Sequence, residues 1–132
     1  MAITYSWTKD LSPEELEKLF LSVDWESGNY PQKLQKAMFN SHKVYSAWDG
    51  GTLIGLINSM TDTVLTVYFQ YLVVHPDFQG HGIGKKLVDT MLDIYSDIPR
   101  KVLISMNEKI GFYEHCGFTH HADKAPMFVS TL

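Results

Sequence analysis

The chain has little cysteine, no long hydrophobic run and no excess of basic residues, and each shortage excludes a class of protein. Cys116 is its single cysteine, so no internal disulfide can form, as is typical of proteins of the reducing cytoplasm. No apolar run approaches the roughly 20 residues that span a bilayer, and the N-terminus lacks the basic and apolar regions of a secretory signal. We therefore expect a cytoplasmic protein without a membrane partner.

Charge and histidine spacing exclude two further classes of partner. Eleven Lys and Arg residues against fifteen Asp and Glu give a formal net charge of −4 at pH 7, which argues against nucleic acid. His115, His120 and His121 lack the spacing of metal ligands, so no metal site is expected. The 132 residues, 45% of them hydrophobic, are typical of one domain with a core of its own. We expect a single domain over residues 1–132.

Apolar periodicity predicts two helices, an antiparallel meander and then a strand–helix–strand unit. Ser12, Pro13 and Glu15 predict a helix start with a capping box, and residues 31–40 predict a second helix. Strands are expected at residues 3–7, 43–48, 52–60, 64–74 and 102–106, with one or two more from Phe118 onward, including 127–130. Further helices are expected at 83–95 and 108–115. This order predicts an α+β fold, a mixed, mostly antiparallel sheet with helices on both faces.

The most informative segment is a glycine-rich turn between the strand at 64–74 and the helix at 83–95. Gly80, Gly82 and Gly84 alternate there with other residues. Such a turn directs free backbone N–H groups and the positive end of the helix dipole at one spot, which favours a phosphate or pyrophosphate. A nucleotide-dependent enzyme is disfavoured, because no Walker sequence is present and Lys85 occupies the third glycine position of a dinucleotide fingerprint.

Two motifs carry a family resemblance. Residues 74–87 fit V-H-P-x-[FY]-[QR]-G-x-G-[IV]-G-x-x-L, and Asn107 is followed by Phe112-Tyr113-Glu114-x-x-Gly-Phe. Over residues 44–118 the chain resembles the GNAT superfamily of acetyl-CoA-dependent N-acetyltransferases. The resemblance implies the GNAT acyltransferase fold and direct transfer of an acetyl group from acetyl-CoA to a primary amine, without a covalent enzyme intermediate.

The resemblance also implies roles for individual residues. Backbone groups of Leu72, Val73 and Val74 would pair with the pantetheine arm of coenzyme A, and Asn107 and Phe112 would contact this arm from the other side. The coenzyme pyrophosphate would be held by the N–H groups of the turn, namely those of Gln79, Gly80, His81, Gly82, Ile83, Gly84 and Lys85. Backbone N–H groups near Val73 and Val74 would polarise the thioester carbonyl.

Tyr113 aligns with the tyrosine that protonates the departing thiolate in many family members. A free phenol has a pKa of about 10 and a thiol of about 8.5, so this proton transfer is uphill by about 2 kcal/mol. Either the thiolate is made more basic, or the start of the helix at 108–115 acidifies the phenol. The other interpretation of Tyr113 is a core aromatic beside Phe112 and Phe118.

The general base and the acceptor pocket are less defined. Residues 67–71 hold no carboxylate where several family members have a glutamate, so Asp24, Glu26, Asp62 or an ordered water chain are open candidates. An acceptor pocket by analogy with the family has four candidate wall residues, each of which could instead be core: Trp25, Tyr30, Phe69 and Tyr71. Such a wall suits a small amine with an apolar or aromatic body.

Two alternatives to a small-molecule acetyltransferase remain at this point. The acceptor could be an exposed amine of a protein, or the chain could be a non-catalytic acyl-CoA sensor that needs no acid, base or acceptor pocket. The oligomeric state is a separate question. Many family members form homodimers through their last strands, and Met127, Phe128 and Val129 could serve that purpose here.

Overall fold

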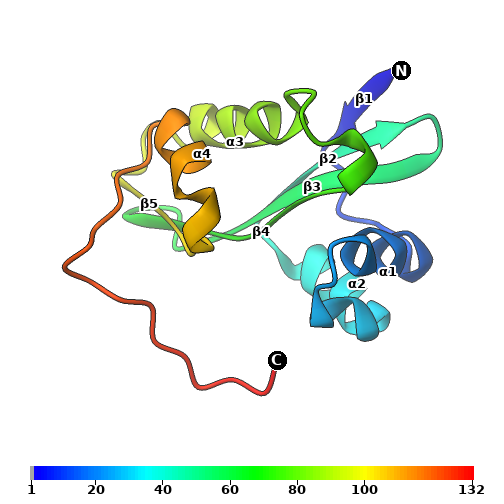
Figure 1. Cartoon of the computed structure of the whole chain (residues 1–132), viewed down its shortest axis with the longest axis horizontal. Coiled ribbons are helices and arrows are strands. Elements are labelled where there is room, and N and C mark those ends of the chain that lie inside the picture. The colour runs from blue at the N-terminus through cyan, green and yellow to red at the C-terminus, as the bar shows by residue number, and fades with distance from the viewer. Residues whose placement is uncertain (1) are drawn as a thin grey trace.

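The computed structural model describes residues 2–132 and contains one five-stranded sheet (Figure 1). The strands lie in chain order, and they are β1 (Ile3–Ser6), β2 (Lys43–Asp49), β3 (Thr52–Thr61), β4 (Thr66–Val74) and β5 (Arg100–Leu103). Each pair of neighbours is antiparallel except β4 and β5, which are parallel. The predicted mixed sheet is therefore confirmed.

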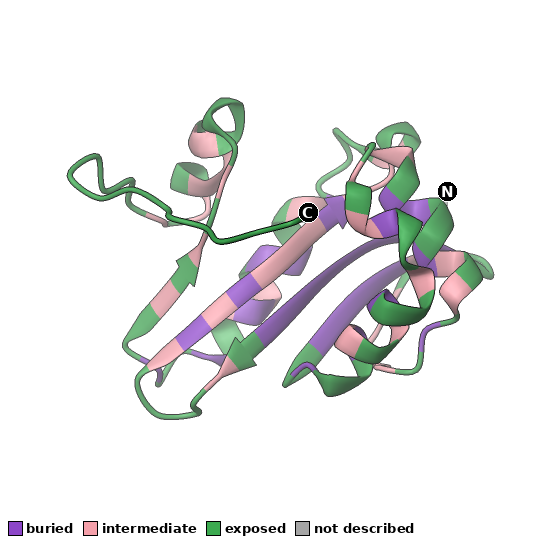
Figure 2. Ribbon diagram, turned by 90° about the horizontal axis from the view of Figure 1, so that it is seen from below, coloured by how far each residue is buried: buried purple, intermediate pink, exposed green. Residues whose placement is uncertain are grey.

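Helices cover both faces of this sheet. On one face lie α1 (Pro13–Ser22) and α2 (Pro31–Asn40), and on the other α3 (Ile83–Ile94) and α4 (Ile110–His115) (Figure 1). Short 3₁₀ helices precede α2, α3 and α4, and these are η1 (Glu26–Asn29), η2 (Pro76–Phe78) and η3 (Asn107–Lys109). Buried residues run along the central strands and the inward sides of the helices (Figure 2). The molecule thus has two cores, one on each face.

The predicted capping box at α1 forms only in part. The Ser12 side chain accepts a hydrogen bond from the Glu15 N–H group at 3.1 Å, as a cap should. The Glu15 carboxylate does not return to Ser12. It accepts instead from the N–H of Leu53 at 3.0 Å. The glutamate therefore fastens the first turn of α1 to the start of β3.

A bulge in β4 decides which side chains face which core. Opposite β3, Leu72 pairs with Ile57 and Phe69 pairs with Ser59, so two residues of β4, Gln70 and Tyr71, stand against the single residue Asn58. Before the bulge, the odd-numbered residues of β4 face α3; after it, the odd-numbered residues face α1. The bulge therefore exchanges the two faces of the strand halfway along it.

The pairing of β4 with β5 ends at the same place. The last pair joins Phe69 to Leu103, and β5 begins at Arg100, two residues before the predicted strand. From Ile104 onward the chain makes no ladder with β4, because the bulge has turned β4 away. The residues of β4 after the bulge consequently have β3 on one side and no strand of the sheet on the other.

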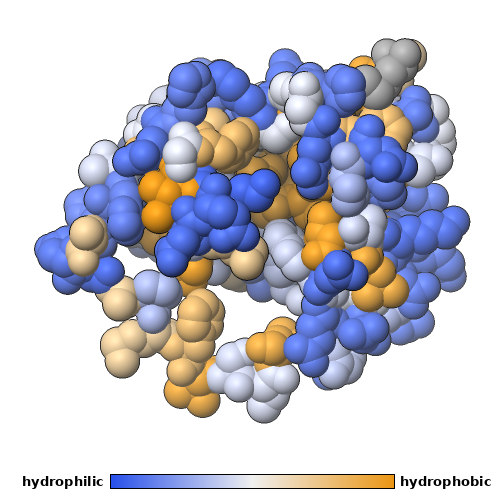
Figure 3. Space-filling view, viewed as in Figure 1, coloured by the Kyte–Doolittle hydropathy of each residue, from blue (hydrophilic) through white to orange (hydrophobic). Residues whose placement is uncertain are grey.

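The predicted C-terminal strands do not form. Residues 118–132 contain no helix or strand, and those after Phe118 are exposed along their whole length (Figure 2). The space-filling view shows the middle of this tail standing off the rest of the molecule and its end returning to the α1–α2 side, where Thr131 and Leu132 line a cleft (Figure 3). Its β-forming residues find no ladder partner, and β propensity depends on such a partner. Within residues 2–132, no helix has the length and apolar character to cross a membrane.

Candidate active site

The glycines at positions 80 and 82 are required by the backbone conformation of the turn and not by a lack of room for a side chain. Gly80 and Gly82 have φ angles of 82° and 81°, in the left-handed region. A Cβ atom added at either position would meet no atom within 4 Å. Glycine is favoured there because residues with a side chain seldom adopt such angles. The same lack of neighbours leaves room for a ligand to approach the main chain.

This turn presents N–H groups at the start of α3. Gly82 caps the helix without a side-chain hydrogen bond, and the N–H of Lys86 bonds to the Gly82 carbonyl at 3.0 Å. By helix geometry the N–H groups of Ile83, Gly84 and Lys85 therefore point out of the helix end without partners inside it. Together with the helix dipole, they favour an anion at this end.

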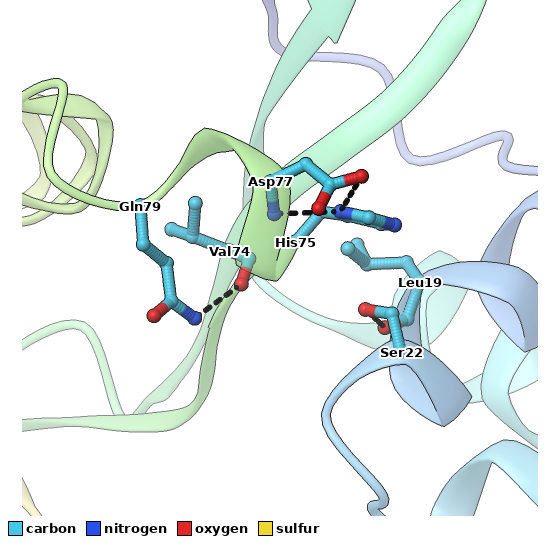
Figure 4. Close-up of polar contacts among 6 residues, drawn as sticks. All are labelled: Leu19, Ser22, Val74, His75, Asp77 and Gln79. Carbon is cyan, nitrogen blue, oxygen red and sulfur yellow. Dashed lines mark hydrogen bonds and ion pairs between the residues drawn. The ribbon is translucent and has the colours of Figure 1, made fainter.

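Two side-chain hydrogen bonds order the segment that joins β4 to the turn (Figure 4). The Gln79 side-chain amide donates to the Val74 carbonyl at 2.9 Å. The His75 ring nitrogen Nδ1 accepts from the Asp77 N–H at 3.1 Å. Gln79 was predicted to act through its N–H group, and its side chain thus has a second task that the sequence did not reveal. The Gln79 contact therefore ties the start of the turn to the last residue of β4.

The remaining predicted coenzyme contacts have different surroundings. Leu72, Val73 and Val74 form the half of β4 that has no strand on its second side. Phe112 of α4 packs at the start of α3, with its ring 3.4 Å from the position of a Cβ added to Gly84 and Val74 close by. His81 is exposed in the turn. Asn107 is exposed in η3, after β5.

The side chain of Lys85 forms an ion pair with a residue of its own helix. Its ammonium lies 2.7 Å from the Asp89 carboxylate, an i,i+4 pair on the exposed side of α3. The hydrogen bond to Asp89 raises the pKa of Lys85. The Lys85 N–H group still points out of the helix end, so its contribution to an anion site is that of the backbone.

Tyr113 is a weaker acid than a free tyrosine. Burial, with a smaller effect of the neighbouring Cys116 thiol, raises the pKa of Tyr113 to about 12. Its ring packs edge-on against Phe112 and Phe118, with centroid distances of 5.1 and 5.9 Å. Proton transfer to a thiolate of pKa about 8.5 is then uphill by about 5 kcal/mol. The idea that the helix start acidifies the phenol is therefore wrong, and the alternative of a more basic buried thiolate is left.

A cleft of about 350 Å³ opens on the other side of β4, against η1 and α2. Two of the four predicted acceptor residues, Tyr30 and Tyr71, line it. The full lining is Ser27, Tyr30, Lys33, Leu34, Ala37, Tyr71, Thr131 and Leu132. The Ser27 and Tyr71 hydroxyls share a hydrogen bond of 3.0 Å. Hydrophobic surface gathers in the recess between the α4 side and the α1–α2 side of the molecule (Figure 3).

The other two predicted acceptor residues lie elsewhere. Trp25 packs behind Tyr71 and against Phe20, with ring centroids 5.9 and 5.8 Å away. Phe69 is only 3% exposed and belongs to the core under α3, where its ring faces Tyr95. Placing Phe69 beside Tyr71 in the pocket was wrong, because the bulge between them turns their side chains to opposite faces. Trp25 supports the cleft from behind.

The sequence did not single out three residues near the cleft side of β4. Because of the bulge, the Tyr68 side chain is on the same face of the sheet as that of Tyr71. Burial and the nearby Tyr71 raise the pKa of Tyr68. Ser27 lines the cleft from η1, and Lys33 lines it from an exposed position of α2. No motif or hydrophobic periodicity in the sequence points to Ser27 or Lys33, so only the folded structure identifies them as lining residues.

The three candidate bases have different surroundings. The Asp62 carboxylate accepts from the N–H groups of Val64, Leu65 and Thr66, which lowers the pKa of Asp62. It closes the turn before β4, at the opposite end of the strand from Val74. Asp24 and Glu26 are exposed on either side of Trp25, and Glu26 is the first residue of η1. They are the carboxylates nearest in sequence to the cleft wall.

Comparison with known proteins agrees with this geometry. A family model described as an acetyltransferase (GNAT) domain matches residues 40–120. The uncharacterized N-acetyltransferase ycf52 of Gracilaria tenuistipitata var. liui is 32% identical over 124 residues, which are 89% of this chain and 68% of the relative.

Solved structures share the fold. A probable acetyltransferase of meticillin-resistant Staphylococcus aureus superposes with a TM-score of 0.86 at 16% identity, over 98% of this chain and 99% of its own. A GNAT-family acetyltransferase of Streptococcus pneumoniae TIGR4 gives a TM-score of 0.81 at 24% identity, over 99% and 100%. The family match over most of the chain and the shared fold lead to one conclusion: this chain belongs to the GNAT family of acetyltransferases.

Proposed function

We propose that this acetyltransferase moves an acetyl group from acetyl-CoA to the primary amine of a small molecule with an apolar or aromatic body. The observation that carries the proposal is the half-paired strand β4. Its free half, Leu72 to Val74, runs directly into a turn whose N–H groups and helix dipole favour a pyrophosphate. An extended pantetheine arm and a pyrophosphate follow each other in coenzyme A in the same order.

In this proposal the backbone binds the coenzyme and aligns the thioester. The free N–H and C=O groups of Leu72, Val73 and Val74 bond to the pantetheine arm as a neighbouring strand would. A backbone N–H near Val73 or Val74 donates to the thioester oxygen and stabilises the negative charge that develops there. Phe112 covers the arm from the side of α4, where it already packs beside Val74.

The transfer itself needs one bond to form and one to break. The amine nitrogen attacks the thioester carbonyl carbon, the C–N bond forms, the C–S bond breaks, and the nitrogen loses a proton while the thiolate gains one. Tyr113 supplies the proton to the sulfur, since its phenol stays protonated far above neutral pH. Asp24, Glu26 or a water chain accepts the proton from the nitrogen.

The acceptor occupies the cleft between η1, α2 and β4. Tyr30, Leu34, Ala37 and Tyr71 give this cleft aromatic and aliphatic walls, and a volume of about 350 Å³ suits a small molecule. The charged side chain on its wall is Lys33. A peptide-borne amine is the second candidate, and the tail residues at the mouth of the cleft leave less room for it.

We further propose that the enzyme works in the cytoplasm as a homodimer. Cys116 is a free thiol, as is usual in a reducing compartment. Met127 and Val129 are fully or almost fully exposed, and Phe128 is 67% exposed. Consecutive exposed apolar side chains favour cover by another molecule. Light scattering on the protein and on Phe128→Asp tests this: the variant is expected to be monomeric, and a monomeric unchanged protein would contradict the dimer.

Calorimetric titration of acetyl-CoA into the purified protein tests the coenzyme site, with NADH and ATP as controls. Binding near one equivalent per chain, by acetyl-CoA alone, is expected. A panel of aliphatic, aromatic and peptide amines, scored by thiol release, then separates small acceptors from protein acceptors and an enzyme from a sensor. No binding of acetyl-CoA would contradict the proposed site, and turnover only with peptides would contradict the small-molecule acceptor.

A further inference from the structure

Asn58 is a polar side chain that follows the apolar residues Leu56 and Ile57 in β3, and it is completely buried. It lies opposite the bulge of β4, where the regular ladder is interrupted. Its carbonyl oxygen accepts from the N–H of Tyr71 at 2.9 Å, and its Nδ2 group donates to the Gln70 side-chain oxygen at 3.0 Å. The side chain therefore supplies an acceptor to the Tyr71 N–H at the place where the bulge interrupts the ladder.

The same amide also reaches the helix layer. Asn58 Nδ2 donates to the Ser41 hydroxyl at 3.1 Å, and the Ser41 hydroxyl donates to the Ala37 carbonyl at 2.8 Å. Ser41 follows the last residue of α2, and Ala37 lines the cleft. One buried group is thus bonded to α2 on one side and to the bulge of β4 on the other.

Few side chains can make this set of contacts. The site needs two donors and one acceptor in a planar arrangement, and the asparagine amide supplies all of them. A leucine of similar volume would leave the Tyr71 N–H buried without an acceptor. Within residues 2–132, no buried side-chain nitrogen or oxygen lacks a hydrogen-bond partner. The junction is therefore complete, and it specifies one distance between α2 and β4.

That distance separates the two substrate sites of the proposed function. The cleft wall consists of Tyr30, Leu34 and Ala37 on one side and Tyr71 on the other. Tyr71 is also the residue that leads into the free half of β4. A shift of α2 against β4 would therefore move the acceptor amine relative to the thioester, and small misplacements of reacting groups are costly.

We propose that Asn58 is a positioning residue: its amide sets the register between the acceptor wall on α2 and the coenzyme-binding half of β4. The inference rests on the proposed function of the two sites. It assigns Asn58 no contact with either substrate. We call its hydrogen bond to Ser41 the α2 arm and its hydrogen bond to the Tyr71 N–H the β4 arm. Breaking one arm at a time should affect the binding of the acceptor and of the coenzyme separately.

Variants of the two arms test the inference. Ser41→Ala breaks the arm to α2 and leaves the β4 arm in place, so it is expected to raise the acceptor KM about fivefold with the acetyl-CoA Kd within about twofold of the unchanged protein. Ser41→Thr keeps a hydroxyl at this position, so its acceptor KM is expected to stay close to that of the unchanged protein. Asn58→Leu breaks both arms and is expected to raise both constants about tenfold.

A matched control separates positioning from stability. Ser46 is also completely buried and hydrogen-bonded, to the Ser6 carbonyl and the Trp48 indole, but it lies on β2, away from both sites. Ser46→Ala is expected to lower the urea midpoint as Ser41→Ala does, with KM and Kd unchanged. Equal KM values for the two alanine variants would overturn the inference, even if Asn58→Leu fails to fold. Failure of the unchanged protein to bind acetyl-CoA would overturn the proposed function and this inference with it.

Discussion

The two halves of β4 carry out different tasks in one strand. From Thr66 to Phe69 the strand has a partner on each side, β3 and β5, and its Phe69 side chain is buried under α3. From the bulge to Val74 it has β3 alone and leads into the glycine-rich turn. The first half is paired on both sides, and the second has no strand on its other side, as the proposed coenzyme site requires. A single bulge makes the change between them.

The comparison teaches that a bulge can leave backbone groups of a strand unpaired inside a sheet. Strands at the rim of a sheet have free backbone groups by necessity. Here β5 pairs with four residues of β4 and then departs, so the free groups lie in the middle of the molecule with a core on each face. Each prediction below changes one half of β4, or the elements fixed to it, and leaves the other half as it is.

The largest effect is expected from Phe69→Ala, in the paired half. Removing this buried ring creates a cavity in the core under α3 and should lower the free energy of unfolding by about 3–5 kcal/mol. Urea denaturation measures the loss, and calorimetry on the folded variant should give an acetyl-CoA Kd within about twofold of the unchanged protein. Phe39→Ala, at a 62% exposed position on α2, is the control and should change neither.

The second effect concerns the turn that follows the free half. Gly82→Ala places a side chain at φ 81° and should weaken acetyl-CoA binding about tenfold, since the N–H groups at the start of α3 move. Gly50, in the turn between β2 and β3, has φ 60° and open space around it. Gly50→Ala should therefore cost the same stability, about 1 kcal/mol, without a change in Kd. Equal Kd values would remove the turn from the site.

The third prediction separates binding from chemistry at α4. Tyr113→Phe should lower kcat about tenfold and leave the acetyl-CoA Kd unchanged, because the ring still packs between Phe112 and Phe118. Since the pKa of Tyr113 is about 12, its proton is retained across the working range, and any fall of kcat between pH 8 and 10 must come from another group. Tyr5→Phe on β1 is the control. A kcat that does not change would reduce Tyr113 to a packing role.

The smallest effect is a pH dependence of the paired half. The Tyr95 hydroxyl bonds to Ser59, which pairs with Phe69, and to the His42 ring at 2.6 Å. Burial, with the nearby Lys43 and Lys9 cations, lowers the pKa of His42 below its usual 6.5. The unfolded chain therefore binds this proton more readily, so the stabilisation is complete above pH 6.5 and is lost as the pH falls through the lowered value.

Urea midpoints at pH 7.5 and pH 5 measure this dependence. The midpoint of the unchanged protein should fall toward acid pH, and that of His42→Asn should fall less. The acetyl-CoA Kd reports on the free half and should not follow the midpoint. A midpoint equally pH-dependent in both proteins would assign the effect to other groups.

The sequence predicts the parts of this fold that local rules determine. Residues 31–40 were predicted as a helix and α2 has these bounds, with Pro31 at its first position. The glycine turn and the start of α3 also follow from local residues. The bulge could not be predicted, because residues 71–74 are as apolar as those before them and alternation shows no break. At the bulge itself the sequence shows only that a polar residue of β3, Asn58, lies opposite a polar residue of β4, Gln70.

Errors in the site follow from that hidden bulge. Phe69 and Tyr71 differ by two positions and share a face in a regular strand, yet they belong to different cores here. The strand predicted at residues 102–106 is β5, which begins at Arg100, two residues earlier. Its bounds depend on which residues of β4 can pair with it, and the bulge limits these residues. The last strands were predicted from composition alone, and composition supplies no ladder partner.

The outer edge of β5 has a consequence for solubility. This strand has β4 on one side and, in the part of the chain that the structure describes, no strand on the other. Unpaired edges are templates for aggregation, and natural sheets protect them by keeping them short and charged. β5 has four residues and begins with Arg100 and Lys101, both cations. We expect these two cations to oppose edge-to-edge association, so replacing them with threonine should increase the formation of fibrous aggregates.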